Sequence, residues 1–148
     1  MRTVTLTHDQ DCFRFSVPNA KAWGDLADYL KERLSPGDVV TLSGPLGAGK
    51  TTFVQTMAAA FGVKKSPQSP TFALMRSYPI PGRGKIKRIV HVDAYRIENE
   101  REILALDLDE EIADGKSVLV IEWPEKIRKW VAAHAPIEVS IAVPKGSK

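Results

Sequence analysis

Residues 44–51, with the sequence GPLGAGKT, have the types and spacing of a phosphate-binding loop and match the pattern G-x-x-x-x-G-K-[ST] at every fixed position. Glycines let the backbone curl so that successive N–H groups face one anion, and the ammonium of Lys50 is placed to reach the outer phosphates. The hydroxyl of Thr51 is placed to bind Mg²⁺. The pattern therefore predicts a nucleotide site made of Gly44, Pro45, Leu46, Gly47, Ala48, Gly49, Lys50, Thr51 and the adjoining Thr52.

The segments on either side of this loop have the order that the chemistry requires. Residues 38–43 (DVVTLS) are typical of a short strand entering the loop, and residues 52–61 are typical of a helix leaving it. The N-terminus of that helix would be aimed at the phosphates, where its N–H groups favour negative charge. A glycine-rich turn with an incidental lysine is the structural alternative.

Two acidic residues are placed to complete a catalytic site. Nucleotide hydrolysis needs an acid that holds the metal, directly or through water, and a group that orients the attacking water. Asp93 follows the apolar residues 89–92 and Glu122 follows the apolar residues 118–121. Ligands gather at the carboxyl ends of strands in open α/β sheets, so both acids are candidate catalytic and metal-binding residues. The alternative is that each acid only caps the segment that follows it.

Hydrophobic periodicity and turn residues predict the elements that position these groups. A turn at residues 79–84 joins two strand-like segments as an antiparallel hairpin, which excludes a wholly parallel sheet. The expected fold is a single α/β domain over residues 1–148, in three layers with a mixed, mostly parallel central sheet, and residues 144–148 are expected to be a flexible tail. Strands are expected at residues 1–7, 71–78, 86–93, 117–122 and 137–143, and helices at 19–34, at 98–112 with a break near Asp107, and at 124–130.

Composition excludes several classes of protein. The chain is 43% hydrophobic, enough for one domain with a core, and its formal net charge of +3 permits an RNA or acidic partner without indicating one. The lone cysteine, Cys12, excludes an intrachain disulfide framework and is expected to be a small apolar filler in a reducing compartment. No apolar run approaches the roughly 20 residues of a membrane span, so a soluble, cytoplasmic protein with no membrane partner is expected.

Other polar residues favour structural roles. The histidines are isolated in sequence and lack metal-ligand spacing, so each is expected to be structural or on the surface. A basic segment is interpreted as a solvated edge that resists sheet pairing, with contact to nucleic-acid phosphate as the alternative. An acidic run is interpreted as a solvated face, which could also dock a basic partner. The histidines are His8, His91 and His134. The basic segment comprises Arg83, Lys85, Lys87 and Arg88, and the acidic run comprises Asp107, Asp109, Glu110 and Glu111.

Four motifs in order give the chain a resemblance to the bacterial TsaE (YjeE-like) ATPase family, which is required for threonylcarbamoyladenosine modification of tRNA. They are residues 44–52 (GPLGAGKTT), 69–72 (SPTF), 91–96 (HVDAYR) and 121–124 (IEWP). Their order and spacing are more specific than the loop alone, and with the helix before the loop they extend the resemblance over nearly the whole chain.

The resemblance implies a P-loop protein that binds ATP and Mg²⁺ and hydrolyses ATP slowly on its own. It implies action with the TsaD and TsaB proteins, which transfer the threonylcarbamoyl group to adenosine in tRNA, so that tRNA is met through the complex. Lys50 would contact phosphates, Thr51 would bind Mg²⁺, and the division of metal and water roles between Asp93 and Glu122 stays open. Thr71 would lie in a switch-like segment near the γ-phosphate. Trp123 would lie beside the nucleotide or a partner surface, with buried packing as the alternative.

Two other functions are compatible with the same loop. A small-molecule or nucleoside kinase uses it for phosphoryl transfer, although the chain has no arginine-rich lid and little sequence left for an acceptor pocket. A nucleotide-dependent binding module with negligible turnover is the third possibility. The motifs favour an ATPase whose nucleotide state controls its docking on the tRNA-modifying complex.

Overall fold

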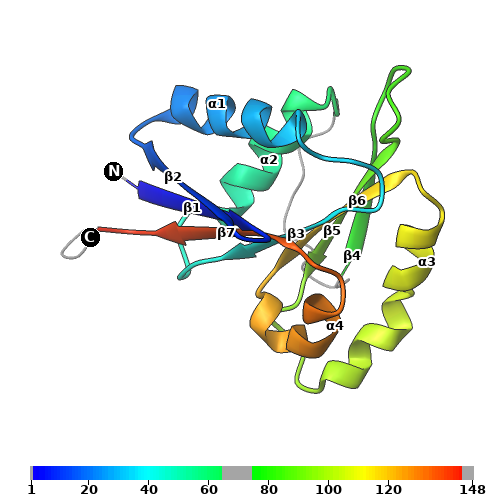
Figure 1. The fold of residues 1–148 in the computed structure, drawn as a ribbon. Coiled ribbons are helices and arrows are strands. Elements are labelled where there is room, and N and C mark those ends of the chain that lie inside the picture. The colour runs from blue at the N-terminus through cyan, green and yellow to red at the C-terminus, as the bar shows by residue number, and fades with distance from the viewer. Residues whose placement is uncertain (1, 65–74, 145–148) are drawn as a thin grey trace.

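The computed structural model describes residues 2–64 and 75–144, and within them seven strands form one sheet in the order β2-β1-β7-β3-β6-β5-β4 (Figure 1). The strands are β1 (Arg2–His8), β2 (Asp11–Val17), β3 (Val39–Ser43), β4 (Met75–Pro79), β5 (Arg88–Asp93), β6 (Ser117–Glu122) and β7 (Ile137–Ala142). The helices are α1 (Ala20–Lys31), α2 (Lys50–Ala60), α3 (Leu108–Ala113) and α4 (Arg128–Ala132), with 3₁₀ turns η1 (Glu100–Leu106) and η2 (Pro124–Ile127).

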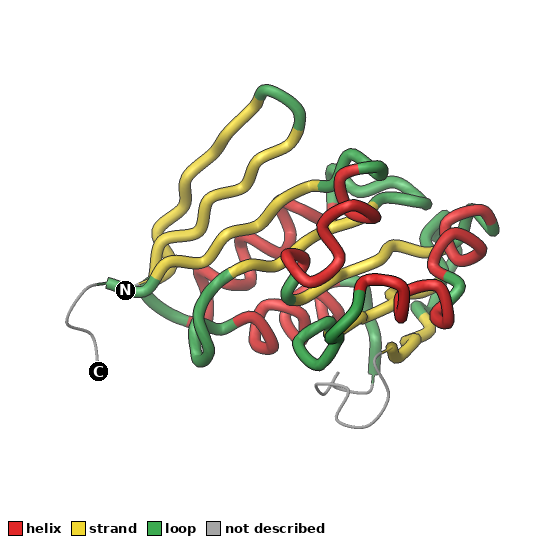
Figure 2. Tube along the Cα trace, turned by 90° about the horizontal axis from the view of Figure 1, so that it is seen from below, coloured by secondary structure: helices red, strands yellow, loops and turns green. Residues whose placement is uncertain are grey.

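The centre of the sheet is parallel and both of its edges are antiparallel. Strands β7, β3, β6 and β5 run parallel to one another, and β4 pairs antiparallel with β5 as the predicted hairpin. The mixed α/β fold predicted from the sequence is therefore confirmed. A second hairpin, β1–β2, pairs antiparallel with β7 at the other edge (Figure 2). It was not predicted, because only its first strand was assigned and the alternation of Phe13, Phe15 and Val17 in β2 was not interpreted as a second strand.

Helices cover both faces of the sheet, which gives the expected three layers (Figure 1). Helices α1 and α2 lie on one face, where Leu30 and Phe53 are buried in the same core as Leu42 of β3. The elements η1, α3, η2 and α4 lie on the other face, where Ile103 and Ile127 share a second core with strand residues that include Leu119 and Ile121. Each central strand is thus buried on both faces, which explains its continuous apolar sequence.

Helix α1 forms as its sequence predicts but ends earlier than expected. The side chain of Asn19 caps it by accepting a hydrogen bond from the Ala22 N–H at 3.0 Å. The helix ends at Lys31 instead of Leu34 because the N–H groups of Arg33 and Leu34 bond three residues back, as in a tightened last turn. Leu34 is still buried, although it lies beyond the helix end.

The second helical segment breaks where predicted, at Asp107, whose backbone is left-handed with φ of 51°. The part before the break is a 3₁₀ turn rather than an α-helix, and the Asn99 side chain caps it at the Arg101 N–H.

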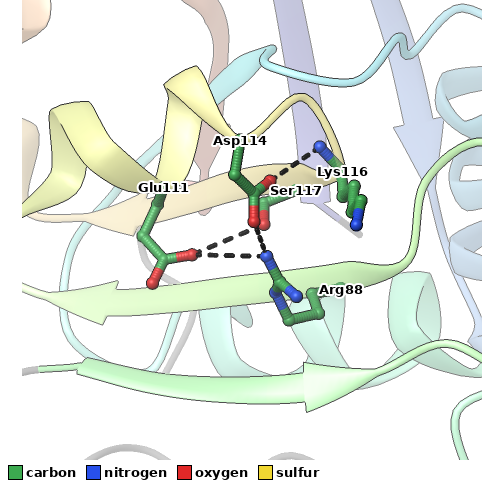
Figure 3. Close-up of polar contacts among 5 residues, drawn as sticks. All are labelled: Arg88, Glu111, Asp114, Lys116 and Ser117. Atoms are coloured by element: carbon green, nitrogen blue, oxygen red, sulfur yellow. Dashed lines mark hydrogen bonds and ion pairs between the residues drawn. The ribbon is translucent and has the colours of Figure 1, made fainter.

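Arg88, at the start of β5, pairs with two acids of the following segment (Figure 3). Its guanidinium contacts the Asp114 carboxylate and lies 3.9 Å from Glu111 Oε2. The Ser117 hydroxyl donates to the same Glu111 oxygen at 3.5 Å, and the Lys116 N–H donates to Asp114 at 2.8 Å. Arg88 therefore anchors α3 to the sheet, which corrects its assignment to a solvated basic edge.

The acidic run is also more engaged than a solvated face. Asp109 accepts from the Trp130 indole at 3.2 Å and lies 3.0 Å from His134 Nε2, so it ties α3 to α4. The expectation for Cys12 is wrong, because this residue lies in edge strand β2 and is exposed. Among the described residues, no helix has the length and apolarity needed to cross a membrane. Thr71 and residues 145–148 of the expected tail lie outside the described residues.

Candidate functional site

The candidate site is built on the loop between β3 and α2. Gly47 and Gly49 adopt positive φ values of 77° and 111°, which residues with a Cβ rarely adopt. The Ala48 N–H donates to the Pro45 carbonyl at 3.1 Å and closes a tight turn with Gly47 at its third position. A Cβ on Gly49 would lie only 3.0 Å from the Trp23 ring. Glycine is therefore required at position 49 by both backbone angle and space.

Helix α2 begins at this loop without a side-chain cap. Its N-cap is Gly49, which has no side chain to cap the first-turn N–H groups. Such N–H groups carry partial positive charge and favour an anion. The loop and the helix terminus therefore present the donors that a phosphate group needs.

Lys50 is nearly buried, with 6% of its surface exposed, and its ammonium lies between two partners. It donates to the Gly44 carbonyl at 2.7 Å and lies 3.4 Å from the centre of the Trp123 ring. Burial lowers the pKa of Lys50, while the negative charges of Glu122, Glu125 and Asp93 act in the opposite direction. A further anion in the pocket would add to this support for the ammonium.

The two predicted acids lie side by side at the carboxyl ends of β5 and β6. Asp93 and Glu122 are register partners across these parallel strands. Oδ1 of Asp93 accepts the Tyr95 N–H at 3.0 Å. Burial raises the pKa of Asp93, and the Glu122 charge acts in the same direction, while the Tyr95 hydrogen bond, His91 and Lys50 oppose the rise. A cation beside Asp93 would offset the cost of burying its charge.

Glu122 is buried and has a direct partner in the strand beside it. Its Oε2 lies 2.6 Å from Nε2 of His91, and the side chains are 4% and 0% exposed. His91 was expected to be structural or on the surface, and it is buried. Its link to Glu122 was missed. The only sequence signal for it is that His91 lies two residues before Asp93, which puts both on one face of the strand.

Trp123 adopts left-handed backbone angles (φ 60°, ψ 52°) directly after β6. Its ring lies 5.0 Å from the ring of Tyr95, and it also packs against the second core. Both positions considered for Trp123 therefore apply, since it lines the site and packs inside.

The predicted residues converge on one pocket of about 310 Å³. Gly44, Pro45 and Ala48 belong to the loop but do not line the pocket, and Thr71 lies outside the described residues. Tyr95 lines the pocket and was not assigned to the site from the sequence. Arg2 was also missed, because it is distant from the loop in sequence. Its guanidinium donates a hydrogen bond to the Gly47 carbonyl at 3.3 Å. The pocket is lined by Leu46, Gly47, Gly49, Lys50, Thr51, Thr52, Asp93, Tyr95, Glu122 and Trp123.

These donors fit a magnesium nucleotide. Mg²⁺ is usually held by one or two protein oxygens together with substrate phosphates and water. The pocket lining that contains Lys50 also contains the hydroxyl of Thr51 and the carboxylates of Asp93 and Glu122. Within the described residues no cluster of three or more His, Cys, Asp or Glu side chains is placed to hold a metal ion.

The sheet order, the loop geometry and the paired acids define an α/β protein of P-loop NTPase-like architecture. The family model described as "Threonylcarbamoyl adenosine biosynthesis protein TsaE" matches residues 17–147. The chain belongs to the TsaE family. The match excludes β1 and most of β2, including Arg2.

Individual relatives agree with this assignment. The tRNA threonylcarbamoyladenosine biosynthesis protein TsaE of Streptomyces coelicolor is 44% identical over 102 residues, which cover 68% of this chain and 66% of that protein, just under two thirds of its length. The TsaE protein of Aquifex aeolicus is 38% identical over 128 residues, covering 85% of this chain and 79% of that protein. The crystal structure of Bacillus subtilis YdiB superposes with a TM-score of 0.62 at 27% identity, covering 96% of this chain and 78% of that chain.

Proposed function

We propose that this chain binds ATP with Mg²⁺ and hydrolyses ATP as an accessory protein of tRNA threonylcarbamoyladenosine modification at the position 37 adenosine. In this proposal its nucleotide state controls docking on, and turnover of, a TsaD/TsaB transferase complex. The observation that carries the proposal is that Lys50, Thr51, Asp93 and Glu122 converge on one pocket at the N-terminus of α2 in a chain of this family.

The loop and Lys50 would bind the phosphates. The uncapped first turn of α2 donates N–H groups, and the Lys50 ammonium would exchange its Gly44 carbonyl partner for a phosphate oxygen. This exchange is favourable because a phosphate carries a full negative charge, which supports a buried ammonium better than a neutral carbonyl does.

The acids would divide the remaining work. Mg²⁺, held by the Thr51 hydroxyl and Asp93, would neutralise charge on the outer phosphates. We assign the metal to Asp93 because burial penalises its carboxylate and a divalent cation would offset that penalty. Glu122 would orient the attacking water, and the low polarity of its surroundings would strengthen that hydrogen bond.

Coupling to partners would occur at the rim of the same pocket. Leu46, on the loop, is 72% exposed, and Tyr95, which follows Asp93, is 47% exposed. Both line the pocket, so a protein docked on them would contact the nucleotide site. Phosphate binding that moves the loop or Trp123 would then change the docking surface, which is how a bound nucleotide biases one state over another.

Reconstituted tRNA modification tests this proposal. Unmodified tRNA would be incubated with the TsaD and TsaB proteins, the threonylcarbamoyl donor and ATP, with and without this chain, and the modified adenosine measured. The chain should stimulate repeated turnover, Lys50→Ala should abolish stimulation, and Lys21→Ala, an exposed change on α1, should preserve it. Equal modification with and without the chain would contradict the proposed role. Partner binding measured with ATP, ADP and a non-hydrolysable analogue would distinguish a motor from a binding module.

A further inference from the structure

A buried histidine lies directly beneath the pocket, and the proposed ATPase function gives it no role so far. His91 of β5 is fully buried, and its Nε2 lies 2.6 Å from Oε2 of Glu122. Its other ring nitrogen, Nδ1, is buried and has no hydrogen-bond partner within the part of the chain that the structure describes. The ring therefore has one polar contact there, and it is with the acid that we assign to the water.

The chemistry of the contact determines which nitrogen carries the proton. An ionised carboxylate only accepts hydrogen bonds, so the nitrogen facing Glu122 must donate, which places a proton on Nε2. The contact therefore places a ring proton on Nε2, and Nδ1 has no polar group among the described residues to donate to.

The sheet explains why the contact is directed at Glu122. Side chains alternate along β5, so His91 and Asp93 lie on the same face, the one that α2 covers. Asp93 and Glu122 are register partners, while His91 pairs with Val120, one step deeper on β6. The imidazole thus reaches diagonally across two strands and contacts one oxygen of Glu122. The other oxygen, Oε1, is not engaged by His91, and Glu122 lines the pocket.

We propose that His91 is a positioning residue that donates its Nε2–H to Glu122 and so orients that carboxylate toward the attacking water. The inference rests on the proposed ATPase function. His91 touches neither nucleotide nor metal in this account. It fixes the rotamer of Glu122, because the hydrogen bond holds one carboxylate oxygen at the imidazole and leaves Oε1 for the water.

A role limited to filling the core is the competing explanation, and two substitutions separate the two. His91→Phe keeps a buried ring without a donor, whereas His91→Gln supplies a side-chain N–H close to the place of Nε2. In the full-length protein with its partners, His91→Phe should lower kcat by about 10-fold or more, with nucleotide Kd changed by less than about 3-fold. His91→Gln should recover most of kcat. Val90→Ala, a buried change on the same strand but the opposite face, is the matched control and should leave kcat within about 2-fold.

A double substitution shows whether His91 acts through Glu122. If it does, adding His91→Phe to Glu122→Ala should not lower kcat further, because the group being positioned is already absent. Equal losses in the Phe and Gln variants, wild-type kcat in His91→Phe, or additive losses in the double variant would each overturn the proposal. Absence of hydrolysis by the wild-type protein with its partners would instead reject the proposed ATPase function.

A readout that needs no hydrolysis tests the contact itself. Long-range ¹H–¹⁵N NMR correlations of the histidine ring distinguish the protonated nitrogen. They should show the His91 proton on Nε2 in the wild-type protein, and its signal should move in Glu122→Ala but not in Glu125→Ala. A proton on Nδ1 alone would overturn the proposal, whatever the ATPase result.

Discussion

The ammonium of Lys50 lies 3.4 Å from the centre of the Trp123 ring, and the same group donates to the Gly44 carbonyl at 2.7 Å. Trp123 follows Glu122 directly, in a left-handed turn, so one short segment presents both an acid and an aromatic face to the loop. A cation against an aromatic ring is stabilised by the quadrupole of the ring. The site thus holds its lysine in place with neutral partners and nearby carboxylates.

Glu122→Ala should slow ATP hydrolysis by about 100-fold, within the range expected for loss of a positioned base, and should change nucleotide Kd much less. The physical reason is that Glu122 acts on water and not on the phosphates that supply binding energy. Single-turnover kinetics and calorimetric titration measure the two quantities. Glu125→Ala, which also removes a negative charge felt by Lys50, is the control. Full partner-stimulated hydrolysis by Glu122→Ala would show that our assignment is wrong.

Asp93→Asn should stabilise the nucleotide-free protein at pH 7. Burial raises the pKa of Asp93 above 3.8, so the folded state binds this proton more tightly than the unfolded state does. The associated stability is fully present below about pH 3.8 and is lost as the pH rises through the folded-state pKa. Asparagine removes the ionisation and keeps an oxygen for the Tyr95 N–H, so the gain should vanish at low pH.

Urea unfolding at several pH values measures this difference in the free energy of unfolding. Asp25→Asn, an exposed change on α1, should show no comparable gain at pH 7. The same Asp93 substitution should weaken Mg²⁺-dependent ATP binding. A loss of stability at pH 7, or a gain that does not depend on pH, would contradict the assignment of a carboxylate whose pKa is raised by burial.

Gly49→Ala should destabilise the protein more than Gly47→Ala. Both glycines have positive φ, so each substitution should cost about 1–2 kcal/mol of backbone strain. A Cβ at position 49 also meets the Trp23 ring at 3.0 Å, whereas one at position 47 has nothing within 4 Å. Overpacking adds about 1–3 kcal/mol. Equal losses in the free energy of unfolding for the two variants would show that the Trp23 ring moves aside and does not restrict the loop at position 49.

Arg2→Ala should raise the nucleotide Kd by about 5-fold, because a hydrogen bond to the Gly47 carbonyl contributes about 1 kcal/mol to loop order. Arg14→Ala, an exposed arginine on β2, is the matched control for the change in net charge. Titration with ATP and Mg²⁺ measures both. Equal Kd values for the two variants would mean that β1 does not support the loop.

The sequence predicts the parts of the site that are local. The loop is a contiguous motif, and Asp93 and Glu122 stand at the ends of apolar strands, so pattern alone locates them. The roles of His91, Arg2 and Trp23 depend on register and on contacts between distant segments, which no local pattern encodes.

The same limit explains the corrections to the fold. Arg88 and Glu111 look like surface charges in sequence, yet they face each other because α3 packs back over β5 and β6 (Figure 3). In edge strand β2, Phe15 and Val17 face the core, whereas Cys12 alternates with them and lies on the opposite face. Cys12 was expected to fill the core and is instead exposed.

The most direct test of the central claim is ATP hydrolysis by the purified protein with Mg²⁺, alone and then with the TsaD and TsaB proteins of the same organism. We expect slow hydrolysis alone, stimulation by the partners, and loss of both in Lys50→Ala, which removes the ammonium at the phosphate site. Hydrolysis that persists in Lys50→Ala, or partner-independent transfer of phosphate to a small acceptor, would contradict the account, and the second result would identify a kinase.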